Sequence, residues 1–327
     1  LERLIRNERV DICVFAYSDV SHETVMHLAS RCIVAGADFK LLSNDRTMIP
    51  SMVPVIAITA VRTGAGKSQT TRYVSSILKK MGKKVVAIRH PMPYGDLVEQ
   101  ACQRFADYSD LDKHKCTIEE REEYEPHIDN GFVVYAGVDY EKILRAAEAE
   151  ADVILWDGGN NDTSFYTPTL QITLVDPHRP GHEATYHPGE VNVLLADLLL
   201  VNKVNTADPA KVAEVEATCR RLNPRATILR CNSEIRVADP AAIRGKRVLI
   251  VEDGPTLTHG GMSYGAGWYA AHDAGAAEIV DPSPYAVGTL AATYAKYPNA
   301  KGILPAMGYG DEQIRDLEAT IRATPAD

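Results

Sequence analysis

The chain has 327 residues, of which 45% are hydrophobic and 24% charged, and its formal net charge is −9. This length suits two or three packed units, the negative charge argues against a general nucleic-acid surface, and no apolar stretch approaches the roughly 20 residues that a membrane helix needs. The six cysteines include no C-x-x-C pair, which argues against a disulfide framework or a zinc knuckle and favours a reducing cytoplasm.

The first elements along the chain predict a β-α-β unit. A strand is expected at residues 11–17, a helix at 21–35 and a second strand after Gly36, and the pattern breaks at the segment 50–54. We therefore assign residues 1–52 to a Rossmann-like N-terminal domain. We expect this domain to be truncated, because the sequence starts inside a predicted helix.

Apolar strands alternate with helices in the next part of the chain, residues 53–245. Strands are predicted in "PVIAITA", "KVVAIRH", "DVILWDGG", "LQITLVDP", "DLLLVNKV" and "ATILRCN", and helices at 67–81, 140–150 and 209–222. This alternation predicts an α/β fold with a mostly parallel sheet that binds ligands at the carboxyl ends of its strands. Residues 246–327 are predicted to form a further α/β section with helices around 269–275, 286–297 and 311–323.

The segment 60–70, "AVRTGAGKSQT", lies between a predicted strand and a predicted helix and resembles a phosphate-binding P-loop. In the pattern G-x-x-x-x-G-K-[ST], backbone N–H groups wrap the phosphates, the lysine reaches the β and γ oxygens, and the hydroxyl binds Mg²⁺. Val61 stands at the first glycine position, and Arg62 stands where a deviant form of the loop carries an extra cation. The residues expected to contact the nucleotide here are Thr63, Gly64, Ala65, Gly66, Lys67, Ser68 and Gln69.

A P-loop needs a carboxylate that organises Mg²⁺ at the end of a neighbouring strand. Asp157 directly follows the apolar run "DVILW" and precedes a glycine pair, so we expect Ser68 and Asp157 to hold the metal. Asp96, with Glu99, is a second acidic candidate after the strand "KVVAIRH". For Asp96, capping of a helix is an equally good interpretation.

The segment "NKVNTAD" resembles the guanine-reading N-K-x-D motif of many GTPases, with Asn202 and Lys203 as its first two residues. Asn205 replaces the aspartate, and a carboxamide cannot accept both hydrogen bonds that guanine donates. ATP, or relaxed use of ATP and GTP, is therefore expected. The alternative is a strand end followed by a helix that Asp208 caps.

Basic and imidazole side chains gather in three predicted loops and could bind an anionic substrate beside the γ-phosphate. The candidates are Arg89, His90, Lys113, His114, Arg179 and His182. A metal site built from His178, His182, His187 and the acidic segment 119–127, "EEREEYEPH", is an alternative, although no fixed ligand spacing supports it.

Several of these segments together resemble the cyclic 2,3-diphosphoglycerate synthetase family, whose P-loop relatives include proteins labelled GTPases. The segments are "AVRTGAGKSQT", "RHPMPYGDL", "DLDKH", "EEREEYEPH", "WDGGNND", "DPHRPGHE", "VEDGPTLTHGGM" and "LPAMGYG", and they span nearly the whole chain. The resemblance implies a Rossmann-like domain before a P-loop domain. It also implies the use of ATP and Mg²⁺ to close 2,3-diphosphoglycerate into its cyclic phosphoanhydride, with release of ADP and phosphate.

In that reaction Lys67 would stabilise the transferring phosphoryl group, Arg62 would offset charge as the bond breaks, and Asp157 and Asp96 would serve as the acidic groups. We expect a cytoplasmic homodimer that binds a nucleotide and a small phosphorylated anion, but neither nucleic acid nor a membrane. Two alternatives stay open. The protein could be a regulatory or chaperone-like nucleotide switch, or a kinase or ligase that acts on another small acid.

Overall fold

The computed structural model describes residues 1–92, 95–159, 161–258, 260–307 and 310–327. The chain divides into two compact units, Leu1–Asn232 and Ser233–Asp327. The division into three parts that we expected from the sequence stays a prediction. Within the described ranges, no helix is long and apolar enough to cross a membrane.

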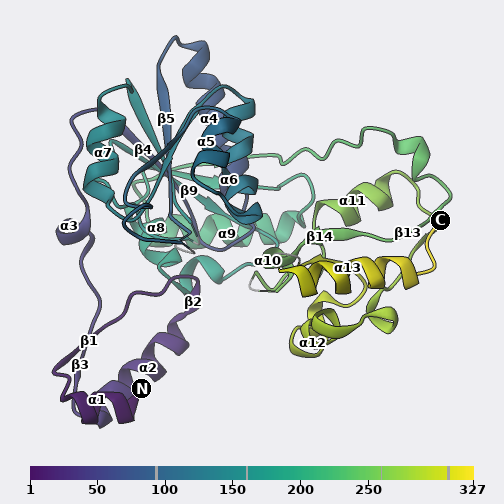
Figure 1. The fold of residues 1–327 in the computed structure, drawn as a ribbon, viewed down its shortest axis with the longest axis horizontal. Helices are drawn as coiled ribbons and strands as arrows, with labels where there is room; N and C mark the ends of the chain where they lie inside the picture. Colours follow the sequence, from purple (N-terminus) through teal and green to yellow (C-terminus); the bar gives the residue numbers. More distant parts are fainter. Residues whose placement is uncertain (93–94, 160, 259, 308–309) are drawn as a thin grey trace. The chain divides into compact units, whose positions relative to one another are not determined.

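An eight-stranded sheet forms the centre of the first unit (Figure 1). All neighbouring strands are parallel except β6 and β7, which are antiparallel. In spatial order the strands are β12 (Thr227–Arg230), β11 (Leu198–Val201), β9 (Leu170–Val175), β4 (Val55–Ala60), β8 (Val153–Asp157), β5 (Val85–Arg89), β7 (Val133–Ala136) and β6 (Gln103–Phe105). The predicted α/β fold with a mostly parallel sheet is confirmed.

Helices cover both faces of this sheet, which is why its central strands read as continuous apolar runs. One face packs against α4 (Lys67–Lys80), α5 (Tyr108–Lys113) and α6 (Ile118–Asp129). The other packs against α7 (Tyr140–Glu148), α8 (Gly189–Leu195) and α9 (Pro209–Leu222). Strand β4 therefore lies in the core, and the loop after it emerges at the edge where the parallel strands end.

The first residues of this unit form a small β-α-β element, as predicted. Strands β1 (Ile12–Val14) and β3 (Asp38–Lys40) are parallel and are joined through α2 (His22–Ala35). The hydroxyl of Ser21 caps the start of α2, and Gly36 ends it with a φ of 101°. The remaining elements here are α1 (Glu2–Glu8), α3 (Asn44–Thr47) and β2 (Val20–Ser21). Strand β2 pairs with β10 (Tyr186–His187), which follows the short helix η1 (His182–Ala184) in the chain.

The second unit holds two pairs of short parallel strands. They are β13 (Arg247–Val248) with β15 (Glu278–Ile279), and β14 (Val251–Asp253) with β16 (Leu304–Ala306). Its helices are α10 (Gly254–Leu257), α11 (Ala266–Asp273), α12 (Gly288–Lys296) and α13 (Asp311–Ala323), with short helices η2 (Pro240–Ala242), η3 (Ser283–Tyr285) and η4 (Pro298–Ala300). Its core contains Ile250, Leu257, Tyr294 and Ile303. The predicted helices of this section lie within a few residues of α11, α12 and α13.

Candidate active site

The loop between β4 and α4 has a backbone that requires glycine at two positions. Gly64 and Gly66 have φ values of 81° and 107°, in the left-handed region that other residues rarely adopt. A Cβ atom on Gly66 would also lie 2.3 Å from Nδ2 of Asn202. The residue before α4 is Gly66, which has no side chain to cap the helix, so the first N–H groups of this 14-residue helix can face an anion.

Two residues after β11 hold this loop through its carbonyl groups. Asn202 donates from Nδ2 to the carbonyl of Ala65 at 2.8 Å, and Lys203 donates from Nζ to the carbonyl of Gly64 at 2.6 Å. Both residues were expected to contact the nucleotide. In the structure they contact the backbone of the loop that would wrap its phosphates.

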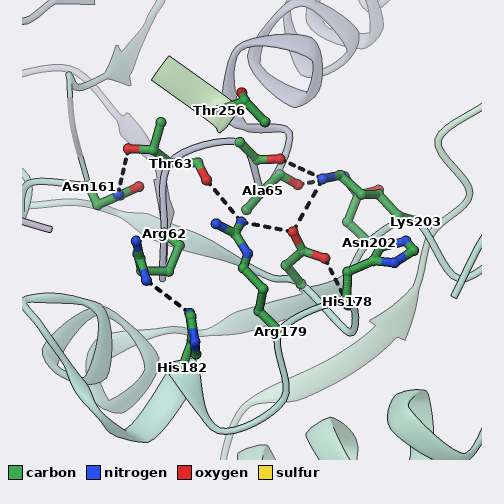
Figure 2. A network of polar contacts seen from close by, with 12 residues as sticks. Arg62, Thr63, Ala65, Asn161, His178, Arg179, His182, Asn202, Lys203 and Thr256 are labelled. Atoms are coloured by element: carbon green, nitrogen blue, oxygen red, sulfur yellow. Dashed lines mark hydrogen bonds and ion pairs between the residues drawn. The ribbon is translucent and has the colours of Figure 1, made fainter. Parts of the chain in front are cut away.

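Figure 2 shows Arg179 and Lys203 on this side of the loop. Asp176, directly after β9, links these two cations. Its buried Oδ2 accepts hydrogen bonds from Arg179 at 2.8 Å and from Lys203 at 3.2 Å. Arg179 also donates to the carbonyl of Thr63 at 2.9 Å. Burial alone would raise the pKa of Asp176, but Lys203 and Arg179 hold it below its ordinary value. Sequence reasoning missed Asp176, although it follows an apolar strand just as Asp157 does.

Asp157, at the end of β8, faces the other side of the loop. It is fully buried, and its Oδ1 accepts a hydrogen bond from Nζ of Lys67 at 3.1 Å, while Lys67 also donates to the carbonyl of Gly158. Its Oδ2 accepts from Arg89 and lies 3.7 Å from Nε2 of His127. Burial would raise the pKa of Asp157, but Arg89 and Lys67 hold it well below the ordinary range. The structure thus brings the predicted lysine and carboxylate into direct contact.

The two expected Mg²⁺ ligands meet at one nitrogen of Arg89. This nitrogen, NH1, donates to Asp157 and lies 3.5 Å from Oγ of Ser68, and NH2 donates to Glu123 on α6. A hydroxyl and a carboxylate are oxygen ligands of the kind that Mg²⁺ accepts. Their side chains fit the metal, but the guanidinium of Arg89 lies between them. Glu123 belongs to the acidic segment 119–127, which we named only as an alternative source of metal ligands, and no sequence signal connects it to Asp157.

The histidine-based metal site finds no support in the described ranges. They contain no group of three or more His, Cys, Asp or Glu side chains that could hold a metal ion. His178 forms a hydrogen bond with the hydroxyl of Thr206 at 3.0 Å, and His187 packs against the ring of Phe15.

Arg62 is buried and contacts the N-terminal β-α-β element. It donates from Nε to Oδ1 of Asp19 at 2.6 Å and from NH1 to Nδ1 of His182 at 2.9 Å, and its guanidinium lies 3.8 Å from the ring centre of Tyr186. The hydroxyl of Thr63 donates to Oδ2 of Asp19 at 2.8 Å. Burial and the charge of Arg62 lower the pKa of His182 to about 4, so its ring is neutral and can accept this bond near pH 7.

The other candidates lie in different surroundings. The ring of His90 lies against Gly159, and its Nε2 is 3.7 Å from Asp162. Asp96 is exposed and accepts a hydrogen bond from the backbone N–H of Val98, within its own turn. Three further candidates lie elsewhere on the surface or in the core. Lys113 is exposed at the end of α5, and His114 packs edge-on against Phe105. Gln69 is exposed in the first turn of α4.

The comparison with known proteins gives one close relative, while no family model matches the chain. Arginine synthetase ArcE from Thermococcus kodakarensis is 62% identical over 327 residues, which are 100% of this chain and 73% of the relative. The chain belongs to the arginine synthetase ArcE family. The name of this relative does not contain the cyclic 2,3-diphosphoglycerate activity expected from the motifs, so that activity stays a prediction.

The solved structures that resemble this ArcE-family chain are distant from it. LpxK from Aquifex aeolicus, in complex with ATP, is 18% identical with a TM-score of 0.39, over 54% of this chain and 55% of that chain. The hydrogenase maturation factor HypB from Archaeoglobus fulgidus is 18% identical with a TM-score of 0.34, over 55% of this chain and 81% of that chain. A ParA family ATPase from Chlorobium tepidum is 11% identical with a TM-score of 0.35, over 56% of this chain and 84% of that chain. Similarities of this size say nothing about what this chain binds.

In this member of the ArcE family, the two sides of the loop therefore differ. On the side of β9 and β11, Asp176, Arg179, Asn202 and Lys203 bind one another and the loop carbonyls. On the side of β8 and β5, Lys67 and Arg89 converge on a single carboxylate, Asp157. The first group can shape the loop, whereas the second can act on a phosphoryl group placed at the start of α4.

Proposed function

We propose that this protein is a synthetase that uses ATP to form arginine. The observation that carries the proposal is the contact between Lys67 Nζ and Asp157 Oδ1, 3.1 Å apart, beside the uncapped start of α4. A lysine and a strand-end carboxylate at a glycine-containing loop are the parts that phosphoryl transfer from a nucleotide needs. The name of the 62% identical relative supports arginine as the product.

The chemistry consistent with such a name has two steps. An acceptor that carries a ureido oxygen where arginine carries a nitrogen attacks the γ-phosphorus, the bond to the β-phosphate oxygen breaks, and ADP leaves. Ammonia or an amine then attacks the activated carbon, the carbon–oxygen bond breaks, inorganic phosphate leaves, and the nitrogen loses a proton. The acceptor oxygen therefore ends in the released phosphate.

The residues of the site have separate roles in this proposal. Lys67 and the N–H groups at the start of α4 stabilise the charge on the transferring phosphoryl group. Ser68 and Asp157 would hold Mg²⁺, which offsets further phosphate charge when it is bound. Arg62 lies at the entrance of the loop, where Asp19 and His182 fix its orientation.

Synthesis of cyclic 2,3-diphosphoglycerate is the second candidate, and the motif set from "RHPMPYGDL" to "LPAMGYG" favours it. That reaction shares the first step, because a phosphate oxygen of the substrate accepts the γ-phosphoryl group. The other phosphate of the substrate then displaces inorganic phosphate and closes the ring. Both candidates consume ATP and release ADP and phosphate, and they differ in the acceptor.

The deciding experiment incubates the protein with Mg-ATP, and in parallel with Mg-GTP, in three arms. One arm contains citrulline, the ureido counterpart of arginine, with ammonium, the second contains 2,3-diphosphoglycerate, and the third contains no acceptor. Amino acids are measured by mass spectrometry and phosphates by phosphorus NMR. Arginine formed in step with ADP supports the proposal, and a cyclic phosphoanhydride supports the second candidate. Equal nucleotide hydrolysis in all arms, without either product, contradicts both and favours a nucleotide switch.

A further inference from the structure

Helix α6 turns a polar face toward the sheet beside Asp157. Its three buried residues are Glu120, Tyr124 and His127, and Glu123 lies on the same face. A helix that packs on a core normally buries an apolar stripe at this spacing. The side chain of Glu123 is 33% exposed, so this polar face reaches solvent at one point.

Several polar atoms on this face are buried without a hydrogen-bond partner among the residues that the structure describes. They are the hydroxyl of Tyr124, both ring nitrogens of His127 and, on the facing strand β5, Nε of Arg89. The great majority of buried polar atoms in folded proteins do have partners, so a group of unpartnered atoms in one place indicates a missing ligand. The ring of Tyr124 stacks on Phe105, and Glu120 accepts hydrogen bonds from Thr117 at the start of the helix, but neither contact uses the Tyr124 hydroxyl or the His127 ring nitrogens.

Two of these side chains, Arg89 and His127, lie next to the carboxylate that Lys67 contacts. Arg89 donates to Asp157, and Nε2 of His127 lies 3.7 Å from the same carboxylate oxygen. Tyr124 precedes His127 by three residues, so the two side chains lie on one face of the helix. The polar face of α6 is therefore on the side of the phosphate loop where a phosphoryl group would be transferred.

The opposite side of the loop offers a contrast. Arg179 and Lys203 each bind both Asp176 and a carbonyl of the loop, and His182 accepts from Arg62. Arg179 and His182 were our expected substrate ligands. Their contacts hold the loop in shape, which leaves the α6 side as the place for a second substrate.

We propose that the polar face of α6, with Glu123, Tyr124 and His127, binds the guanidino end of the amino acid beside Asp157, an inference that rests on the proposed function. Glu123 and Asp157 already bind the two terminal nitrogens of one planar guanidinium, that of Arg89. Carboxylates suit such a group because its N–H donors are planar and divergent. The hydroxyl of Tyr124 and the ring of His127 supply the further hydrogen bonds that the reacting nitrogen and oxygen atoms need.

The test uses L-arginine as the probe, titrated into the protein in the presence of saturating Mg-ADP and followed by calorimetry. We expect Tyr124→Phe and His127→Phe to weaken arginine binding about tenfold each, since each removes one hydrogen bond to a charged ligand. The affinity for Mg-ADP alone should stay within about twofold of that of the wild type. Tyr135→Phe is the matched control, because the Tyr135 hydroxyl donates to Glu150 at 2.7 Å elsewhere on the sheet.

Different outcomes separate this inference from the proposed function. If the wild type does not bind arginine with Mg-ADP present, arginine synthesis fails and the inference fails with it. If the wild type binds arginine and both variants bind it equally well, arginine synthesis stands and the role of α6 is wrong. Glu123→Gln provides a third variant, whose side chain is partly exposed and of the same shape, and unaltered arginine binding by it also contradicts the inference.

Discussion

Nζ of Lys203 lies 3.2 Å from Oδ2 of Asp176, although the two residues follow different strands, β11 and β9. The same lysine donates to the carbonyl of Gly64. Arg179 likewise binds Asp176 and donates to the carbonyl of Thr63. One buried carboxylate thus fixes two cations, and each cation fixes one carbonyl of the phosphate loop. The shape of the loop therefore depends on a buried charge that is joined to the loop through Arg179 and Lys203.

Asp176→Asn keeps the shape of the side chain but removes this charge. We expect the free energy of unfolding to fall by about 3–5 kcal/mol, because two largely buried cations lose their counter-charge. Nucleotide affinity should fall with it, as measured with a fluorescent ATP analogue. Glu216→Gln, which alters the exposed pair with Arg230, should cost about 1 kcal/mol or less. Equal losses in the two variants would contradict a special role of Asp176.

Lys67→Ala should remove nucleotide turnover. The ammonium group belongs to the first residue of α4, and its loss leaves the transferring phosphoryl group without this charge. We expect a fall of about a thousandfold in the rate of ADP release, measured by a coupled assay. Lys80→Ala, at the exposed far end of the same helix, is the control and should keep the wild-type rate. Turnover that survives in the Lys67 variant would place the reaction at another site.

The part of this site that the sequence predicts is the part carried by local patterns. The loop 60–70 and Asp157 each follow an apolar strand directly, so the parallel sheet brings them together without further information. Asp176 carries the same signal, because it follows β9. Asp176 could have been found by examining the acidic residue that directly follows each predicted apolar strand, as was done for Asp157.

Other parts depend on contacts that no local pattern encodes. Asp19 reaches Arg62 across 43 positions, through a turn in which Asp19 itself has a positive φ. Helix α6 escaped prediction because sequence reading relies on an apolar stripe, and the buried positions of α6 are Glu120, Tyr124 and His127. A helix whose buried residues are polar lacks the apolar periodicity by which helices are predicted, so it is missed.

Arg89 and Glu123 should set the Mg²⁺ requirement of the site in opposite directions. Arg89 lies between Ser68 and Asp157, so Arg89→Ala should lower the Mg²⁺ concentration that half-saturates nucleotide binding. Glu123→Gln removes the other partner of Arg89 and should raise that concentration, because the guanidinium then depends more on Asp157. Binding of a fluorescent nucleotide at graded Mg²⁺ measures both effects.

Arg104→Ala is the matched control for this pair, since Arg104 binds Glu150 in an exposed bidentate pair. Its Mg²⁺ dependence should equal that of the wild type. Thermal unfolding of each variant shows whether the fold is retained. A shift in the same direction for the Arg89 and Glu123 variants would rule out competition between Arg89 and the metal.

His182 should make stability depend on pH in a defined window. Burial and the positive charges of Arg62 and Arg179 lower its pKa from 6.5 to about 4, with Asp176 and Asp19 opposing this shift. Between these two values the unfolded chain binds a proton that the folded chain does not, so the folded state loses stability as the pH falls from about 6.5 to about 4. Above about 6.5, this contribution of His182 is constant.

Denaturant unfolding of the wild type and of His182→Asn at pH 7 and pH 5 tests this dependence. The variant cannot take up the proton when it unfolds, so the stability advantage of the wild type should be largest at pH 7 and should shrink at pH 5. A difference between wild type and His182→Asn that is equal at both pH values would mean that Arg62 does not hold this ring in its neutral form.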